Sequence, residues 1–190
     1  IIMAILLFPP AAAIGLIILL VHGRPVLYFE RRVGLNGRSF TLYKFKTLGF
    51  VTDHTKAANS LENRIFKNGT PENCPGVFLK FLRKYSLDEL PQFFNVLNGS
   101  MSIVGPRPHA VAHNEYYRRL IPGYMLRHKV RPGLTGWAQV NGWRGETETL
   151  DKMEKRVEFD LEYLRRWSLW FDLKIIMLTI FRGFKDSHAY

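Results

Sequence analysis

The first 21 residues of the chain carry no charged side chain. As a straight helix, the run from Ile1 to Val21 would be about 30 Å long, which matches the hydrocarbon core of a bilayer. Pro9 and Pro10 lie in its middle, and consecutive prolines remove two backbone donors and clash with the preceding turn, so we expect the helix to bend or break there. A break there would allow a re-entrant hairpin whose ends return to one side of the membrane. We therefore predict a membrane anchor over 1–22, and the pattern leaves open whether it spans or re-enters the bilayer.

Polar sequence follows the anchor and indicates its orientation. The segment 22–25 interrupts the apolar run, and Arg31 and Arg32 add positive charge close by. Positive charge is enriched on the cytoplasmic flanks of membrane segments. We expect 23–190 to form one domain on the cytoplasmic side, and we expect further residues upstream because the chain starts within apolar sequence.

The charge balance indicates an anionic partner. The chain has 27 Lys and Arg against 16 Asp and Glu, a formal net charge of +11. Anionic lipid, phosphorylated metabolites and nucleic acid would all fit this charge. The basic residues are scattered and no nucleic-acid recognition motif is present, so we expect no nucleic acid. A single cysteine, Cys74, excludes an internal disulfide and fits a reducing compartment.

Two β-rich segments, 26–33 and 38–45, flank a turn at Asn36-Gly37, which predicts a β-hairpin. A period of two would place Lys44 and Lys46 on the same face of the second strand. The two lysines could simply be solvated. They could also bind a diphosphate, and the pattern alone does not decide between these interpretations.

Two helices are predicted near the C-terminus. Apolar residues recur at helical spacing over 150–164, which predicts an amphipathic helix. Over 167–184 only a narrow polar stripe remains, which is typical of a helix lying in the membrane interface, with a buried core helix as the alternative. A polar loop is predicted over 52–75. Together with the hairpin, these elements predict an α+β fold.

Adjacent carboxylates at Asp88 and Glu89 are the main catalytic candidates. Ser86 and Glu89 have the spacing of a capping box, which predicts a helix beginning here. A helix N-terminus beside Arg83 and Lys84 favours an ionised carboxylate and can recruit Mg²⁺ or phosphate. An ionised aspartate is a competent nucleophile toward phosphorus.

Two arginines beside prolines are candidates for binding phosphate. Arg107 lies between Pro106 and Pro108, and Arg131 precedes Pro132. Prolines restrict the backbone and so can hold a guanidinium in place, although simple surface turns would have the same sequence. The glycine-rich segment that follows, which includes Gln139, predicts a tight loop close to a ligand.

These motifs, in this order behind an apolar anchor, carry a resemblance. The segments 86–92, 104–108 and 131–142 resemble the bacterial sugar transferase family, the monotopic phosphoglycosyltransferases. The stretch 137–147 and the ending at Tyr190 are similar, more narrowly, to the undecaprenyl-phosphate glucose phosphotransferases.

The resemblance implies a reaction and its residues. Such enzymes convert a UDP-sugar and a polyprenyl phosphate into a polyprenyl-diphosphate sugar and UMP, with Mg²⁺ as cofactor. Asp88 would be the nucleophile that forms a covalent phosphosugar intermediate, and Glu89 would help to bind Mg²⁺ or orient the attack. Asp88 and Glu89 are also the two candidate ligands of Mg²⁺. The candidate substrate- and phosphate-binding residues are Lys44, Lys46, Arg107, Arg131 and Gln139.

The resemblance also implies partners and a location. The donor would be a UDP-sugar, with glucose favoured over galactose, and the acceptor undecaprenyl phosphate. The family's re-entrant anchor favours the hairpin over the span, in contact with membrane lipid at the bacterial inner membrane and with the catalytic domain on the cytoplasmic face. A homo-oligomer is compatible with these residues. The alternative is a basic membrane-associated protein that binds anionic lipid without catalysis.

Overall fold

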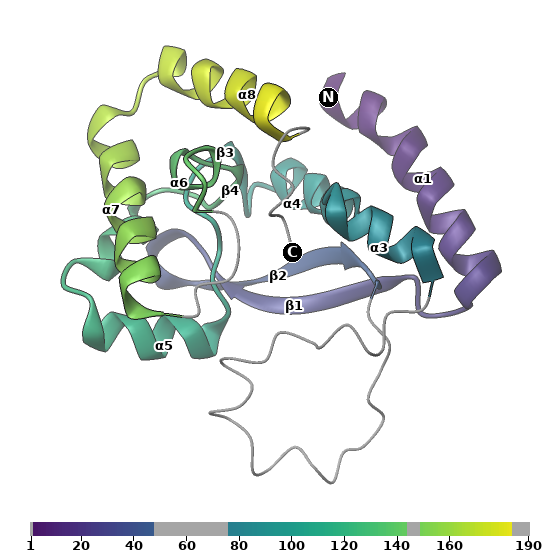
Figure 1. Ribbon diagram of the computed structural model, residues 1–190, viewed down its shortest axis with the longest axis horizontal. Helices are drawn as coiled ribbons and strands as arrows, with labels where there is room; N and C mark the ends of the chain where they lie inside the picture. The colour runs from purple at the N-terminus through teal and green to yellow at the C-terminus, as the bar shows by residue number, and fades with distance from the viewer. Residues whose placement is uncertain (1, 48–75, 144–148, 184–190) are drawn as a thin grey trace, which may run out of the picture.

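A computed structural model describes residues 2–47, 76–143 and 149–183. The polar loop predicted over 52–75 lies outside the described residues. Figure 1 shows a β-hairpin through the middle of the molecule, with helices above it and along both sides. Helices and separate strands together confirm the predicted α+β class.

The N-terminal helix α1 covers Ile2–His22 and is continuous through Pro9 and Pro10. The predicted break at the prolines is therefore not present. Ala11 and Ile18 are buried against the rest of the protein, and tertiary packing of this kind can offset the two lost backbone hydrogen bonds. Within the described ranges, no helix has both the length and the apolarity needed to cross a membrane.

The predicted hairpin is confirmed. Strands β1 (Leu27–Val33) and β2 (Ser39–Phe45) pair antiparallel. The turn between them contains η1 (Leu35–Gly37), where Asn36 and Gly37 have φ values of 54° and 74°. Asparagine and glycine tolerate this left-handed conformation, so these residues fix the position of the turn.

Three short helices follow the hairpin and lie above it in Figure 1. They are α3 (Gly76–Lys84), the 3-10 helix η4 (Leu87–Gln92) and α4 (Phe93–Leu97). Their apolar sides share one core with α1 and β2, so this core continues across the boundary proposed after residue 22. Its buried members are Ala11, Ile18, Phe45, Leu79, Leu82 and Phe93.

A second sheet was not predicted. Strands β3 (Ser102–Val104) and β4 (Gly133–Thr135) pair in parallel. Between them the chain forms α5 (Val111–Leu120) and the 3-10 helix η5 (Tyr124–Lys129). Each strand has only three residues, which is too short for a period-two pattern to appear in the sequence.

The C-terminal part is helical. After the short α6 (Trp137–Val140) come α7 (Leu150–Arg166) and α8 (Leu169–Gly183). The amphipathic pattern predicted α7 correctly, and Met153 and Val157 from that pattern are buried.

Asp172 and Thr179, two residues of the polar stripe on α8, face the protein. Tyr163 Oη donates to Asp172 Oδ1 at 2.9 Å, and the hydroxyls of Thr135 and Thr179 lie 2.7 Å apart. The opposite side of α8 is apolar and exposed, so the alternative of a wholly buried core helix is wrong. Its exposed residues include Leu169, Trp170, Leu173, Met177, Ile180 and Phe181.

Candidate active site

Asp88 and Glu89 lie in the first turn of η4. The predicted capping box is wrong, because the Ser86 side chain makes no capping hydrogen bond to this helix. Ser86 is left-handed (φ 53°), whereas a capping residue adopts an extended conformation. The Glu89 side chain pairs with two cations from other parts of the chain, so it does not reach back to Ser86.

Glu89 joins three segments of the chain: η4, β2 and the turn after β3. Arg107 binds it in a bidentate manner, with Nη2 donating to Oε1 at 2.7 Å and Nη1 donating to Oε2 at 3.2 Å. Lys44 Nζ, from β2, donates to Oε1 at 3.0 Å. The Glu89 side chain is only 12% exposed, so these ion pairs are partly shielded from water. Lys44 is therefore a paired residue of the site and not a solvated lysine.

The environment of Glu89 keeps it ionised. Burial acts to raise the pKa of the Glu89 carboxyl, but the charges and hydrogen bonds of Arg107 and Lys44 overcome this effect. The pKa of Glu89 is held well below its ordinary value as a result. Glu89 is thus a fixed negative charge that aligns two cations beside Asp88.

Asp88 has the opposite shift. Burial, with a further contribution from the negative charge of Glu89, raises the pKa of Asp88 to about 6. Nearby positive charges act in the lowering direction and are outweighed. Among the described residues, the Asp88 carboxylate makes no hydrogen bond and no ion pair. With a pKa of about 6 the Asp88 carboxyl is mostly ionised at neutral pH. Because it has no partner among the described residues, it is available to a substrate.

The turns that carry Arg107 and Arg131 lie side by side. Gly133 N donates to Pro106 O at 3.0 Å, which extends the contact between β3 and β4 into both turns. A Cβ on Gly133 would lie 2.1 Å from Gly105 N, so only glycine allows this approach. The parallel strand pair therefore brings together two motifs that are separate in the sequence.

The other three candidates lie in different parts of the fold. Arg131 has an exposed side chain in the turn next to Arg107. Lys46 follows the end of β2 and is partly buried. Gln139 is buried in α6, where its Nε2 donates to Leu134 O at 3.3 Å, and its Oε1 has no partner among the described residues. Roles for these three residues in binding substrate remain predictions.

Asn95 is an important residue that the sequence analysis missed. It is 1% exposed in α4, accepts from Tyr43 N at 3.2 Å and donates to Thr41 O at 2.8 Å. These bonds fix β2, which carries Lys44, against the segment that carries the two carboxylates. A lone amide within the apolar run 93–97 was the signal available in the sequence.

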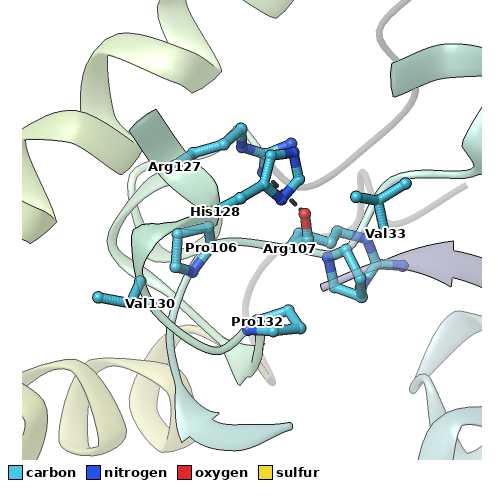
Figure 2. Close-up of a pocket in the computed structure, with 8 residues that line it drawn as sticks. Val33, Pro106, Arg107, Arg127, His128, Val130 and Pro132 are labelled. Atoms are coloured by element: carbon cyan, nitrogen blue, oxygen red, sulfur yellow. Dashed lines mark hydrogen bonds between the residues drawn. The ribbon is translucent and has the colours of Figure 1, made fainter. Parts of the chain in front are cut away.

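A buried ion pair behind Arg107 was also missed. Arg127 Nε donates to Asp160 Oδ2 at 3.0 Å, and Arg127 Nη2 donates to Arg107 O at 2.7 Å, the bond drawn in Figure 2. Asp160 lies three residues after Val157 on the apolar face of α7, and a carboxylate at such a position indicates a buried partner. The recess in Figure 2 is lined by Val33, Pro106, Arg107, Pro108, Arg127, His128, Val130 and Pro132.

The site contains a possible ligand for a divalent cation. Asp88 offers carboxylate oxygens, whereas both oxygens of Glu89 are engaged by cations. No cluster of three or more His, Cys, Asp or Glu side chains suited to a metal occurs in the part of the chain that the structure describes. Mg²⁺ in phosphoryl-transfer sites is commonly held by one or two carboxylates together with substrate phosphates and water. The residues present fit that mode through Asp88.

Comparison with known proteins identifies the family. The model for "Bacterial sugar transferase" matches residues 1–186. The chain belongs to the bacterial sugar transferase family. It is 54% identical over 188 residues to the UDP-glucose:undecaprenyl-phosphate glucose-1-phosphate transferase of Escherichia coli, which covers 98% of this chain and 38% of that protein.

Two further relatives show that proteins of this family are named for different sugars. A protein of the same name from Xanthomonas campestris is 49% identical over 187 residues, covering 97% of this chain and 37% of that protein. The UDP-N-acetylgalactosamine-undecaprenyl-phosphate N-acetylgalactosaminephosphotransferase of Aeromonas hydrophila is 38% identical over 182 residues, covering 94% and 40%. The chain thus spans little more than a third of the length of these three relatives.

Proposed function

We propose that this chain is the catalytic part of a phosphoglycosyltransferase that transfers glucose 1-phosphate from UDP-glucose to undecaprenyl phosphate. The observation that carries the proposal is the Asp88 carboxylate, unpaired among the described residues and adjacent to a Glu89 that aligns two cations. Identity is higher to the two relatives named for glucose than to the one named for N-acetylgalactosamine, which supports glucose as the sugar. The reaction would be the first membrane step in the synthesis of an exopolysaccharide, capsule or O-antigen.

In the first half-reaction, an Asp88 oxygen attacks the β-phosphorus of UDP-glucose. The bond from that phosphorus to the oxygen bridging the α-phosphate breaks, and UMP leaves with the electron pair. Lys44 and Arg107 supply positive charge where the phosphate oxygens become more negative, and Glu89 holds both cations in position. A carboxylate with a raised pKa is more basic than an ordinary aspartate, yet largely ionised at neutral pH.

In the second half-reaction, a phosphate oxygen of the lipid acceptor attacks the same phosphorus. The bond to Asp88 breaks, the carboxylate is regenerated, and undecaprenyl-diphosphate glucose is released. Arg131, in the turn beside Arg107, is a further contact for phosphate charge. Asp88 would hold Mg²⁺, which when bound would supply positive charge toward the donor phosphates. Glu89 would influence that ion mainly through Asp88, because its own oxygens are engaged.

The location proposed for this reaction is the cytoplasmic face of the bacterial inner membrane, with α1 as a monotopic anchor. The sugar donor is soluble and the acceptor is a lipid, so the site must be close to the bilayer surface. Exposed apolar residues on α1 and α8 support this placement, since solvent would otherwise contact a large apolar area. Among the described large apolar side chains of these two helices, the most exposed are those of Phe8, Leu20, Val21, Leu169, Trp170 and Phe181.

Substitution of the nucleophile tests the proposal. We expect Asp88→Asn to abolish UMP release from UDP-glucose, because an amide cannot form the acyl phosphate at this position. Asp151→Asn is the matched control: Asp151 is an exposed aspartate in the first turn of α7. Intact-mass measurement after incubation with donor alone should show one added hexose phosphate on the wild type and on the control, but not on Asp88→Asn.

The outcomes separate the proposed function from its alternative. Normal turnover by Asp88→Asn, or no adduct under rapid quenching despite turnover, would contradict the proposed nucleophile. UMP release from another UDP-sugar in preference to UDP-glucose would contradict glucose as the sugar but would remain consistent with the proposed mechanism. No UMP from any UDP-sugar, by purified protein with undecaprenyl phosphate, would favour a lipid-binding protein without catalysis.

A further inference from the structure

We propose that Arg127 and Asp160 are positioning residues that hold Arg107 in place, an inference that rests on the proposed function. Arg127 lies in η5 and Asp160 lies in α7, and each is only 1% exposed. Within the described ranges, neither side chain has a hydrogen bond to Asp88 or Glu89. Their effect on the reaction would therefore pass through the main chain of Arg107.

Arg127 and Asp160 form a fully buried ion pair. Nε of Arg127 donates to Asp160 Oδ2 at 3.0 Å, and Nη2 lies 2.7 Å from the same oxygen. The guanidinium also lies over the Tyr124 ring, 5.5 Å from its centroid. A buried guanidinium is very costly without a partner charge, so Asp160 fixes the position of Arg127.

Arg127 Nη1 also contacts the ring of His109, 3.1 Å from its Nε2, and a further contact of Arg127 reaches the candidate active site. Nη2 donates to the carbonyl oxygen of Arg107 at 2.7 Å, as Figure 2 shows. Pro106 and Pro108 flank this carbonyl and restrict rotation of the turn. Fixing the Arg107 main chain fixes the origin of the side chain that holds Glu89. The hydrogen bond to the Arg107 carbonyl thus connects two ion pairs. One is formed by Asp160 and Arg127, and the other by Arg107 and Glu89.

The geometry requires the planar fork of arginine at 127. The guanidinium presents several donors in a fixed arrangement, so it can meet Asp160 and Arg107 O together. A lysine at this position could keep the charge pair with Asp160 but lacks the second rigid donor. Arg127→Lys therefore removes the contact to Arg107 while leaving a buried cation beside its carboxylate.

A double-mutant cycle tests whether Arg127 acts through Arg107. The variants are Arg107→Lys, Arg127→Lys, Asp160→Asn and each of the last two combined with Arg107→Lys. The readouts are kcat and KM for UMP release together with the unfolding temperature. We expect each single change at 127 or 160 to lower kcat about tenfold, the order of magnitude of one lost charge-assisted hydrogen bond. On the Arg107→Lys background, the same changes should lower kcat less than about twofold, because coupled residues are not additive.

A surface pair on α7 provides the control. Lys155 and Glu158 lie 2.8 Å apart and are both more than half exposed. Glu158→Gln should leave kcat and KM unchanged. A purely structural role of Arg127 would instead lower the unfolding temperature and lower kcat by the same factor on both backgrounds. Asp160→Asn keeps the test valid if Arg127→Lys fails to fold.

The results distinguish the inference from the proposed function. An active wild type with multiplicative effects, or with unchanged kcat in both Arg127→Lys and Asp160→Asn, overturns the positioning role alone. An inactive wild type overturns the proposed function, and this inference with it.

Discussion

Asp88 and Glu89 are neighbours in the chain, and their carboxyl pKa values move in opposite directions. Glu89 accepts three hydrogen bonds from two cations, whereas Asp88 accepts none from the described residues. Burial therefore dominates the pKa of Asp88, and ion pairing dominates that of Glu89. Because the folded protein binds the Asp88 proton more tightly than the unfolded chain does, ionisation of Asp88 at neutral pH lowers stability. The free energy of unfolding is therefore lower at neutral pH than it would be with an aspartate of ordinary pKa at this position.

The raised pKa of Asp88 predicts an acid limit to the reaction. Protonated Asp88 cannot attack phosphorus, so kcat/KM for UDP-glucose should fall about tenfold per pH unit below about pH 6. Glu89 stays ionised over this range and should not contribute. The measurement is kcat/KM at fixed Mg²⁺ over a range of about pH 4.5 to 8, which includes the raised pKa of Asp88 and approaches the ordinary pKa of an aspartate. A higher Mg²⁺ concentration should move the limit to lower pH, because the metal competes with the proton. A flat profile down to pH 5 would contradict the assignment.

At the scale of the elements, α1 forms one wall of the core under the carboxylates. Ile18 is 1% exposed and shares a buried cluster with Phe45 at the end of β2 and Leu82 of α3. Leu87 and Leu90, on either side of the two carboxylates in η4, pack against the same cluster. An apolar helix that the sequence presents as an anchor is thus also part of the support of the site.

This packing predicts that the buried side of α1 matters for folding. Ile18→Ala should lower the free energy of unfolding by about 2–5 kcal/mol, the usual cost of such a cavity. Leu20→Ala is the matched control, since Leu20 is 76% exposed on the same helix and should change stability little. Denaturant unfolding of both variants in the same detergent would measure the difference. Equal loss in the two variants would contradict a core role for Ile18.

At the scale of the whole molecule, the chain combines a positive net charge with an exposed apolar helix face. The chain carries a formal charge of +11, and α8 presents an apolar face outward. Figure 1 shows α8 at the top of the molecule and α5 at the lower left, below the hairpin. A bilayer of anionic lipid would satisfy both the apolar face of α8 and the positive charge.

This distribution predicts which face binds the membrane. Trp170 is 81% exposed on α8, and Trp170→Ser should weaken partition into phosphatidylglycerol vesicles about tenfold. Tyr116→Ser is the control, because Tyr116 is an exposed aromatic residue on α5 at the other edge of the molecule. Vesicle flotation of the two variants and the wild type gives the comparison. If Trp170→Ser floats like the wild type, α8 is not part of the membrane-binding face.

The sequence by itself determined the elements with local patterns. Asn36-Gly37 defined the hairpin, helical spacing defined α7, and adjacent carboxylates at 88 and 89 defined the candidate nucleophile. Each of these depends on residues within a few positions of one another, so propensity and periodicity suffice. The expected helix break at Pro9-Pro10 and the capping box at Ser86 were wrong, because packing of α1 and pairing of Glu89 outweighed local preference.

Only the tertiary structure decided which charges meet. Lys44 and Glu89 are 45 positions apart, and Arg127 and Asp160 are 33 apart. No local pattern links such residues; they meet because β2 lies against η4 and because η5 packs against α7. A buried charge needs a partner charge, and here the partner comes from a distant part of the chain. The ion pairs, and the two opposite pKa shifts, therefore arise only in the folded protein.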